Sequence, residues 1–489
     1  MSVSLKRLLL AAVGGLCLLG TAAGAGAVLY LQEQGVAPRT LAPYIERRSD
    51  GHNPLITKTG HWLGERLRLL DRGEGLPLAL PALAAGAQAT PVAGPAGGAL
   101  KPVDSPEAVL RAIAGAQAGD VITLAPGRYH LRARVDARAT GTAAAPITVR
   151  AARPGTVTIE FETVEGFVVR SPYWRFENLT IRGVCRDDKW CEHAFHVVGA
   201  GAHFAALNNT IVDFNAHFKI NGDNGVFPDH GLIEGNTLSN TRPRRTSNPV
   251  TPVDLVAASD WIVRGNLILD FIKAGGDRVS YGAFAKGAGA RTLFERNIVW
   301  CEARLRGQAG QRVGLSLGGG GTGKPYCRDK QCVNEQQDGV VRDNLIASCS
   351  DVGIYLNSAS GSVVEHNTLV DTTGIDVRFP ASSARVDGNL VDGPIRSRND
   401  GLLRLGDNRT TALGWSYVGR HPVRGLFRDW DDGDLGWHGE VPRRAGAADR
   451  PDLCGKARPA KPAYGAFEDF SACLVPVTAP ATSSSKSAN

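Results

Sequence analysis

The sequence is short of several residue types, and each shortage excludes a class of protein. Methionine occurs once, at position 1, so a methionine-rich adaptable binding surface is excluded. Aromatic residues make up 7% of the chain, and 59 glycines and 27 prolines in 489 residues are too few for a collagen-like or low-complexity chain. The net charge of +7 is a mild excess that does not by itself indicate a nucleic acid partner, and we predict none. The 43% of hydrophobic residues is instead typical of a globular protein with a core.

One long uncharged segment stands at the N-terminus. Residues 8–31 carry no charge and follow Lys6 and Arg7. A run of this length can span a bilayer, with its basic flank on the cytoplasmic side. The alternative is a cleaved signal peptide, because residues 25–27 read Ala-Gly-Ala. Both interpretations of residues 1–31 export the remaining chain to the periplasm or the cell exterior, and the first anchors it in the inner membrane through residues 8–31.

The cysteines agree with export. Apart from Cys17 there are eight, an even number, which is typical of a disulfide set in an oxidising compartment. The alternative of a zinc site has little support, because neither close pair has the Cys-x-x-Cys spacing of zinc ligands. The predicted disulfides are Cys185–Cys191, Cys301–Cys349, Cys327–Cys332 and Cys454–Cys473.

The composition changes along the chain and divides it into segments. Residues 32–75 are polar with a short helical pattern, and 76–104 are rich in Ala, Pro and Gly and indicate a linker. A short helix is expected from Ser105 to Ile113, with Pro106 at its start. Residues 411–475 do not repeat and are expected to cover the open end of the repeating domain, and 476–489 form a polar tail that we expect to be disordered.

Between these segments a short sequence motif recurs. In it, Asn follows a predicted strand that contains Val, Ile or Phe and precedes a second apolar strand. Successive repeats lie 22 to 47 residues apart, and the longest step contains the Cys327/Cys332 loop. A minimum near 22 predicts one coil of a parallel β-helix, with the longer steps carrying inserted loops. The fold class is therefore all-β, a single-stranded right-handed parallel β-helix solenoid over 105–410. We expect the repeated Asn side chains to bond from coil to coil; they are Asn178, Asn209, Asn236, Asn266, Asn297, Asn344, Asn367 and Asn389.

A second strand in each coil carries the residues that point outward. Its first and third positions are nearly all apolar, so the second and fourth must face away from the core. Stacked coils would then form two outward columns on one face, either a binding groove or an ordinary solvated sheet surface. One column is His196, Lys219, Asp254, Phe284, Ser316, Tyr355, Asp376 and Arg396; the other is Val198, Asn221, Val256, Lys286, Gly318, Asn357, Arg378 and Arg398.

The segment Gly119 to Tyr129, followed by 141–151, resembles the first coils of the pectin-lyase-like superfamily of right-handed parallel β-helices. The nearest resemblance is to polysaccharide lyase family six, the chondroitinase B and alginate lyase group. The resemblance implies a Lys base, which Lys286 matches by its place in the strand, an Arg one coil later, and calcium as cofactor. Gly318 stands where that Arg would be, so Arg312 or the loop with Glu335 and Asp338 would have to substitute. Mannuronan C5-epimerases share the fold, and their signature is partly matched by residues 228–230 (Pro-Asp-His).

The groove residues match the needs of uronate chemistry. β-Elimination needs a base for the C5 proton, an acid for the leaving O4 and cations for the carboxylate. We predict Lys286 as base, Tyr355 as proton relay and Arg378 as carboxylate clamp. No metal ligands are predicted from spacing. The predicted substrate-binding residues are His196, Lys219, Asn221, Asp254, Asn357, Asp376, Arg396 and Arg398.

Three functions for this groove remain open. They are lysis of an anionic polysaccharide, C5-epimerisation of one, and non-catalytic binding by an envelope scaffold. Hydrolysis is disfavoured, because it needs two carboxylates about 5–9.5 Å apart. Asp254 and Asp376 stand four rungs apart, or ~19 Å.

Overall fold

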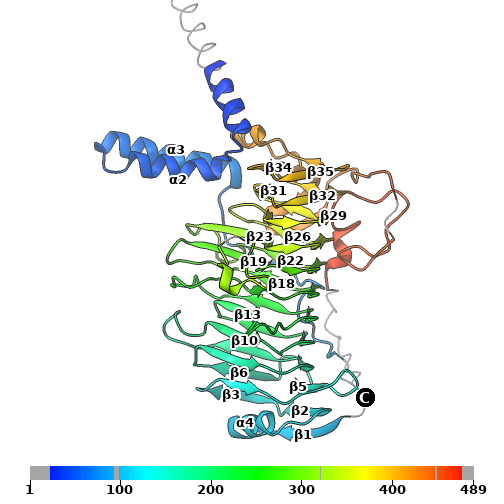
Figure 1. The fold of residues 1–489 in the computed structure, drawn as a ribbon. Helices are drawn as coiled ribbons and strands as arrows, with labels where there is room; N and C mark the ends of the chain where they lie inside the picture. The colour runs from blue at the N-terminus through cyan, green and yellow to red at the C-terminus, as the bar shows by residue number, and fades with distance from the viewer. Residues whose placement is uncertain (1–21, 93–97, 320, 447–448, 476–489) are drawn as a thin grey trace, which may run out of the picture.

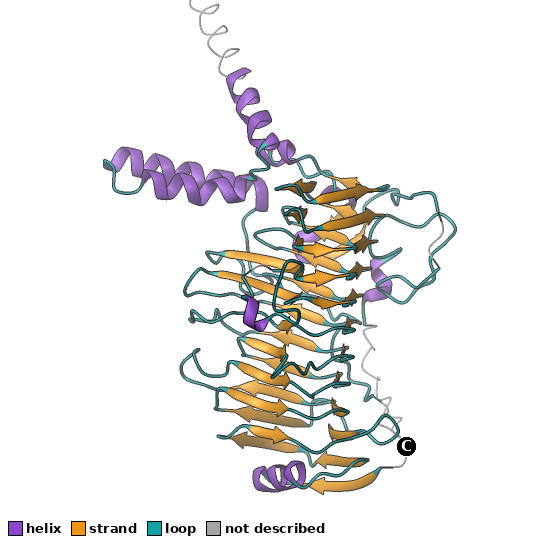
Figure 2. Cartoon of the chain, in the orientation of Figure 1, coloured by secondary structure: helices purple, strands orange, loops and turns teal. Residues whose placement is uncertain are grey.

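A computed structural model describes residues 22–92, 98–319, 321–446 and 449–475. Its centre is a solenoid in which each coil adds one parallel strand to each of three sheets (Figures 1 and 2). The first sheet contains β1 (Ala99–Val103), β2 (Asp120–Leu124), β5 (Ile147–Ala151), β8 (Trp174–Glu177), β11 (Ala205–Leu207), β14 (Leu232–Glu234), β17 (Ile262–Arg264), β21 (Leu293–Glu295), β25 (Val340–Arg342), β29 (Ser362–Glu365), β32 (Ser383–Asp387) and β35 (Leu402–Leu405).

The second sheet, called the groove sheet below, carries the outward columns predicted from the sequence. It contains β4 (Val135–Ala137), β7 (Glu165–Val169), β10 (His193–Val198), β13 (Ala216–Asn221), β16 (Val253–Val256), β19 (Val279–Lys286), β23 (Gln311–Gly318), β27 (Ile354–Asn357), β31 (Ile375–Arg378) and β34 (Ile395–Arg398). The third sheet contains β3 (Gly127–Leu131), β6 (Val157–Phe161), β9 (Thr180–Gly183), β12 (Thr210–Val212), β15 (Thr237–Ser239), β18 (Leu267–Leu269), β22 (Ile298–Trp300), β26 (Leu345–Ala347), β30 (Thr368–Val370), β33 (Leu390–Val391) and β36 (Arg409–Thr410). The prediction of a parallel β-helix is confirmed.

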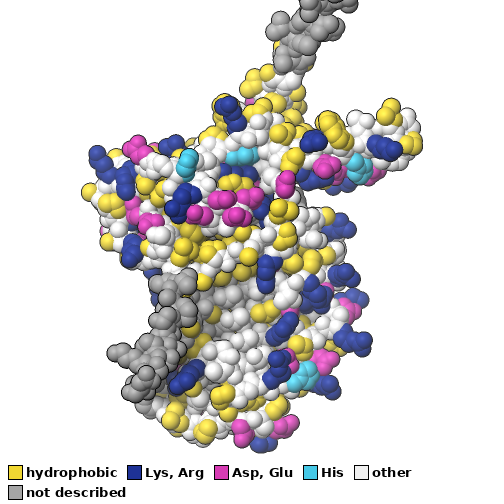
Figure 3. Space-filling model, turned by 180° about the vertical axis from the view of Figure 1, so that it is seen from behind, with side chains coloured by type: hydrophobic (Ala, Val, Ile, Leu, Met, Phe, Trp, Pro, Cys, Tyr) yellow, Lys and Arg dark blue, Asp and Glu magenta, His cyan; other side chains and the backbone are white. Residues whose placement is uncertain are grey.

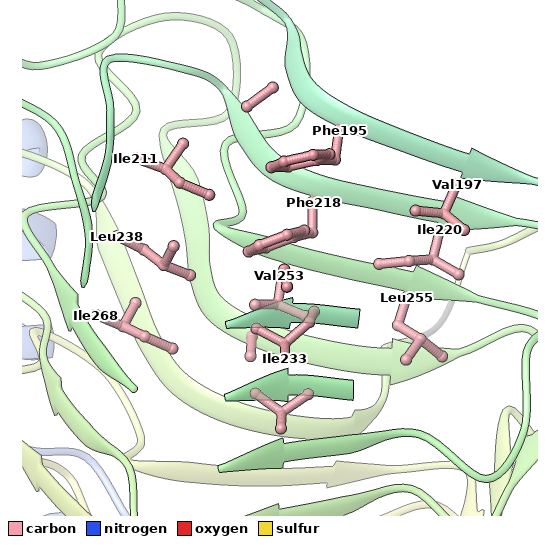
Figure 4. Close-up of a cluster of buried hydrophobic side chains, with 14 of the residues drawn as sticks. Phe195, Val197, Ile211, Phe218, Ile220, Ile233, Leu238, Val253, Leu255 and Ile268 are labelled. Atoms are coloured by element: carbon pink, nitrogen blue, oxygen red, sulfur yellow. The ribbon is translucent and has the colours of Figure 1, made fainter. Parts of the chain in front are cut away.

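Like side chains stack from coil to coil inside the solenoid. The rings of Phe167, Phe195 and Phe218 stack at centroid distances of 5.3 and 5.2 Å, and all three are fully buried. Figure 4 shows Phe218 below Phe195, and beside them the aliphatic column that begins with Val197 and Ile220. Full burial of such a side chain contributes about 1.5–3 kcal/mol, so the alternating pattern accounts for the stability of the coils.

The Asn ladder is present, with one change at each end. Side-chain amides bond from coil to coil, as where Asn266 Nδ2 donates to Asn297 Oδ1 at 2.9 Å. Asn178 is not part of this ladder, because register places Leu179 opposite Asn209, and Asn178 instead accepts a hydrogen bond from Asn208. The ladder continues one coil further than predicted. Its members are Asn209, Asn236, Asn266, Asn297, Asn344, Asn367, Asn389 and Asn408.

The predicted helix caps the first coil. Helix α4 (Pro106–Ala114) begins after Ser105, whose side chain accepts a hydrogen bond from Ala108 N at 3.2 Å. Its apolar face buries Val109 and Ile113 against the start of the core. This helix therefore covers apolar surface that an open first coil would expose.

The N-terminal region lies at the opposite end of the solenoid from β1 (Figure 1). A helix over 22–33 is followed by a hairpin of α2 (Pro38–Ser49) and α3 (Pro54–Arg72), which projects beside the last coils (Figure 2). The hairpin leaves Leu55, Ile56 and Trp62 exposed, and apolar atoms are visible along it in Figure 3. The described residues contain no helix long and apolar enough to cross a bilayer. Most of the predicted membrane segment 8–31, namely residues 8–21, lies outside them.

Residues 76–92 are bound to the solenoid rather than forming the free linker expected over 76–104. Leu78 N donates to Ala303 O at 2.9 Å, Gly86 N to Gly265 O at 2.8 Å, and Gln88 N to Asn208 Oδ1 at 2.6 Å. This segment thus runs along the outside of successive coils, and 99–103 form β1. Small residues allow the close approach: a Cβ on Gly86 would lie 2.6 Å from Thr237 Oγ1.

The C-terminal segment also differs from the prediction, because much of it lies against the side of the solenoid. Its apolar residues, including Phe427 and Phe467, pack on Trp300 and Leu345 of the third sheet. The last coil is instead contacted by the N-terminal segment, where Arg396 Nη1 of β34 donates to Gly35 O at 2.5 Å. The C-terminal segment joins this contact where Tyr417 OH donates to Val36 O at 2.7 Å. The segment contains η2 (Leu413–Val418), η3 (Arg424–Leu426), β37 (Phe427–Asp429), η4 (Trp430–Asp432), β38 (Asp434–Trp437) and η5 (Phe470–Cys473). The predicted tail 476–489 lies outside the described residues.

All four predicted disulfides are present: Cys185–Cys191, Cys301–Cys349, Cys327–Cys332 and Cys454–Cys473. This set is typical of a secreted or periplasmic protein. Cys301 and Cys349 join neighbouring coils across 48 residues, whereas Cys185 and Cys191 are six residues apart.

Loop length predicts unequal contributions of these bonds to stability. Replacing both Cys301 and Cys349 by Ala should lower the free energy of unfolding by about 4 kcal/mol, against about 2 kcal/mol for the Cys185/Cys191 pair, because the longer loop gains more entropy when released. Denaturant unfolding of the two double variants measures the difference. Equal losses would contradict the chain-entropy explanation.

Candidate functional site

The register of the groove sheet matches the two predicted columns. His196 pairs with Lys219, Lys219 with Asp254, and Asp254 with Phe284. Further along, Ser316 pairs with Tyr355, Tyr355 with Asp376 and Asp376 with Arg396. The second predicted column is also in register at the β34 end of the sheet, where Asn357 pairs with Arg378 and Arg378 with Arg398.

Loops between the coils divide this face into two cavities. The larger, of about 1000 Å³, lies over β13, β16 and β19. The smaller, of about 470 Å³, lies over β27, β31 and β34, and both are lined by Val279 and Tyr281. Of the predicted site residues, the larger cavity has Lys219, Asn221, Asp254 and Lys286, and the smaller has Tyr355, Asp376, Arg378, Arg396 and Arg398. His196 and Asn357 line neither.

Lys286 stands at the end of β19 on the wall of the larger cavity. Its ammonium lies 4.4 Å from the ring centroid of Phe284, a cation–π contact. Burial lowers the pKa of Lys286, and the nearby Lys219 lowers it further, against the opposing effects of Asp254 and Glu335. Among the described residues, no carboxylate lies within 4.0 Å of its Nζ. The ammonium of Lys286 is therefore easier to deprotonate than that of a fully solvated lysine.

The other cations near this cavity are engaged. Lys219 Nζ donates to Asp254 Oδ2 at 3.0 Å, and Lys273 Nζ to Asp277 Oδ1 at 2.7 Å. These pairs hold the lysines in place and offset part of their charge. A ligand carboxylate would contact Lys219 while Lys219 keeps its ion pair with Asp254, so Asp254 would not lose its counter-charge.

Tyr281 is a site residue that the sequence analysis missed. It lies on the same strand as Lys286, and its ring contacts Phe284 edge-on at 5.5 Å, so both residues flank one phenylalanine. Burial raises the pKa of Tyr281 to about 12, with Tyr355 adding to the effect. Tyr281 thus keeps its proton at neutral pH and can act as a donor. The four-residue strand segment that was compared between coils begins at Ala283, two residues after Tyr281, so the comparison did not include Tyr281.

The smaller cavity holds a network of arginines. Arg396 and Arg398 both bind Asp376, at 2.8 Å each. Arg378 Nη1 donates to Tyr355 OH at 3.1 Å, and Asn357 Nδ2 lies 3.3 Å from the same hydroxyl. With three arginines against two aspartates, Asp351 and Asp376, this end of the groove keeps a positive balance. Tyr355, predicted as a relay for Lys286, here contacts Arg378 in the neighbouring cavity.

Four residues considered above as substitutes for the missing Arg or as an epimerase signature have structural partners. Arg312 is fully buried and bound to Glu302 at 2.8 Å, so it does not reach the groove. Glu335 accepts hydrogen bonds from Gly287 N and Thr322 Oγ1. Asp229 is held by both terminal nitrogens of Arg328, at 2.7 and 2.8 Å, while His230 stacks on His203 at a turn. The Pro-Asp-His segment therefore organises a loop.

The groove carboxylates do not fit the calcium ion that the family resemblance implied. Asp254 is engaged by Lys219, and Asp376 by two arginines. In the part of the chain that the structure describes, no cluster of three or more acidic, His or Cys ligands includes either residue. Calcium prefers several carboxylate and carbonyl oxygens converging on one point, so no step below is assigned to it.

No family model and no curated protein matches the chain. Among solved structures, it is similar to pectate lyase Pel9A, with a TM-score of 0.49, 15% identity, and coverage of 73% of this chain and 90% of that chain. An alginate lyase from Paenibacillus sp. str. FPU-7 gives a TM-score of 0.35 at 15% identity, covering 64% and 95% of the two chains. The PL6 family polysaccharide lyase Pedsa3628 from Pseudopedobacter saltans gives 0.33 at 13%, covering 69% and 96%. The sheet topology by itself makes this chain a parallel β-helix.

Proposed function

We propose that the larger cavity binds an anionic polysaccharide and cleaves it by β-elimination, with Lys286 as the base. The observation that carries the proposal is the state of Lys286. It is a half-buried cavity lysine that has an aromatic ring beside it and, within the described chain, no ion-pair partner. A lysine with a lowered pKa in a desolvated site is a general base.

The surrounding residues supply the other two requirements of the reaction. Lys286 takes the C5 proton of a uronate, and the electron pair left behind forms the C4–C5 double bond as the C4–O4 bond breaks. Tyr281, protonated at neutral pH, donates its proton to the leaving O4. Lys219 lies next to the sugar carboxylate and stabilises the charge that develops during proton removal. Arg378, Arg396 and Arg398 in the smaller cavity would contact a neighbouring uronate of the same chain.

The fold also supports a location for this activity. We propose that the N-terminus anchors the protein in the inner membrane, with the solenoid in the periplasm. The helix over 22–33 continues the predicted apolar segment, and the α2–α3 hairpin beside it exposes Leu55, Ile56 and Trp62. Exposed apolar side chains on a helical segment of this kind are typical of a membrane interface.

Incubation of the full-length protein with a panel of anionic and neutral polysaccharides tests the activity. We expect the absorbance of unsaturated uronates to rise with at least one polyuronate and with no neutral glucan. A C5-epimerase would instead exchange the C5 proton with deuterated solvent without that absorbance, and a binding protein would do neither. Binding restricted to neutral glycans would contradict the proposed substrate class.

A further inference from the structure

A cluster of two histidines and a glutamate lies on the groove sheet, outside the residues used in the proposed reaction. Glu165 is on β7, and His193 and His196 are on the next strand, β10. Glu165 Oε1 lies 2.5 Å from His196 Nδ1 and 3.8 Å from His193 Nδ1. The three side chains are 14–21% exposed, so the cluster is shielded but open to small solutes.

The hydrogen bonds around His196 determine which of its ring nitrogens carries the proton. Asn221 Nδ2 donates to Gly222 O at 3.0 Å, which turns Asn221 Oδ1 toward His196. His196 Nε2 lies 2.8 Å from that oxygen and must donate to it. A neutral His196 therefore presents a lone pair at Nδ1. This lone pair faces a carboxylate oxygen, an arrangement that is repulsive unless a proton or a cation lies between them.

The second histidine offers a lone pair at the same place. His193 Nδ1 is buried and has no hydrogen-bond partner in the described structure. Its nearest acidic neighbours are 3.8 Å away, Glu165 Oε1 on one side and, facing Nε2, Glu192 Oε1 on the other. A buried ring nitrogen without a partner loses free energy of solvation, which a ligand would restore.

The remaining neighbours leave one carboxylate oxygen available. Arg134 Nη1 lies 3.6 Å from Glu165 Oε2, the oxygen that faces away from the histidines, and Arg134 is shared with Asp136. Oε1 and the two Nδ1 atoms thus converge with the correct charge for a divalent cation.

We propose that Glu165, His193 and His196 bind a divalent transition metal ion of the zinc type. Two imidazoles and one carboxylate are a ligand set that zinc and non-haem iron use when one position stays open. Bonds of about 2.0–2.1 Å separate tetrahedral ligand atoms by about 3.3 Å, and the observed 2.5 and 3.8 Å lie on either side of that value. Asn221 Oδ1 accepts the hydrogen bond from His196 Nε2 and so orients His196, as is common for metal-bound histidines.

The site is independent of the proposed lysis, although Asn221 connects the two. Asn221 also lines the larger cavity, so a bound ion would fix one wall of that cavity through His196. The metal and the reaction therefore have separate tests. Loss of metal binding would leave Lys286 and its aromatic neighbour unchanged.

Titration of the full-length protein, purified without a histidine tag and treated with a chelator, tests the proposal. We expect one equivalent of Zn²⁺ to bind by calorimetry, and Co²⁺ to give the visible absorption of a four-coordinate site. His196→Gln and Glu165→Gln should each weaken binding by at least about 100-fold, and Asn221→Ala by about 10–100-fold, the range seen for second-shell partners.

The matched control is His230→Gln, which removes an exposed histidine stacked at a turn and should leave Zn²⁺ binding unchanged. Thermal unfolding in chelator checks that each variant folds. The proposal is overturned if the parent protein binds no Zn²⁺, or if His196→Gln binds it as tightly as the parent. In that event nitrogen NMR should show both ring nitrogens of His196 protonated at neutral pH, the signature of a simple imidazolium–carboxylate pair.

Discussion

Lys286→Ala is expected to lower kcat on a polyuronate by about 10²–10⁴-fold, the usual contribution of a general base. The ammonium contacts the Phe284 ring, and the side chain has no ion-pair partner among the described residues, so its loss leaves no buried carboxylate uncompensated. Substrate affinity should fall much less, because Lys219 and the arginines of the smaller cavity remain. Initial rates and equilibrium binding with the same polysaccharide separate the two effects.

The pH dependence of the parent enzyme provides a second readout. The base must be neutral, so kcat should rise with pH as Lys286 loses its proton. Because burial lowers the pKa of Lys286, that limb should lie below the usual lysine value of about 10.4. Lys330→Ala is the matched control, since Lys330 is on the cavity rim and donates only to Pro325 O in the described structure. If Lys286→Ala turns over substrate at the parent rate, Lys286 is not the base.

Asp371→Ala is expected to cause the largest loss of stability, about 3–5 kcal/mol, the usual cost of removing one partner from a buried ion pair. Asp371 is fully buried where the hairpin, the solenoid and the C-terminal segment meet. It lies 2.8 Å from Arg39 of α2, 3.2 Å from Arg72 of α3 and 3.4 Å from Arg424 of η3. Without it, these buried guanidinium groups lose a shared counter-charge.

Denaturant unfolding, with the hairpin followed by limited proteolysis, measures this effect. Asp371→Asn should also destabilise, because it keeps the volume and removes the charge, whereas Asp50→Asn on the exposed hairpin turn should be neutral. An Asp371→Asn variant as stable as the parent would show that packing, not charge, holds the junction.

The same residue predicts a pH dependence. Burial alone would raise the pKa of Asp371, but Arg72, Arg39, Arg424 and Arg306 outweigh burial and hold it below the usual value. An unfolded aspartate titrates near about 3.9. The stabilisation is therefore fully present above that pH and is lost as pH falls below it, because the unfolded chain then binds the proton more readily. Loss of stability on acidification should be smaller in Asp371→Asn than in the parent.

Local repetition explains how much of the fold could be predicted. Each coil repeats the same apolar alternation and the same Asn turn, so the β-helix, the groove register and the pairing of Cys301 with Cys349 all follow from spacing. The misplacement of Asn178 shows the limit of this reasoning. Comparing short sequence motifs does not detect a shift of one residue in strand register. That shift places Leu179, rather than Asn178, opposite Asn209 at the end of the ladder.

The segments outside the repeat had no such periodicity, and their positions depend on contacts far apart in the chain. The 76–92 segment looked like a linker because Ala, Gly and Pro carry no pattern, yet it is bound by backbone hydrogen bonds to coils up to 225 residues away, as between Leu78 and Ala303. Asp371 and the arginines around it come from four distant stretches of sequence. A count of charges along the chain contains no information on such pairing.

The sequence by itself determined the solenoid, the disulfides and the outward face that carries Lys286, because side-chain periodicity and stacking are properties of each coil. Only the tertiary structure decided how that face is used. Inserted loops, which follow no repeat, divide it into two cavities, and the packing around Lys286 leaves it without an ion-pair partner in the described chain. Strand register brings Glu165 to His193 and His196, since 28 residues of chain separate Glu165 from His193 while one inter-strand spacing separates them in space.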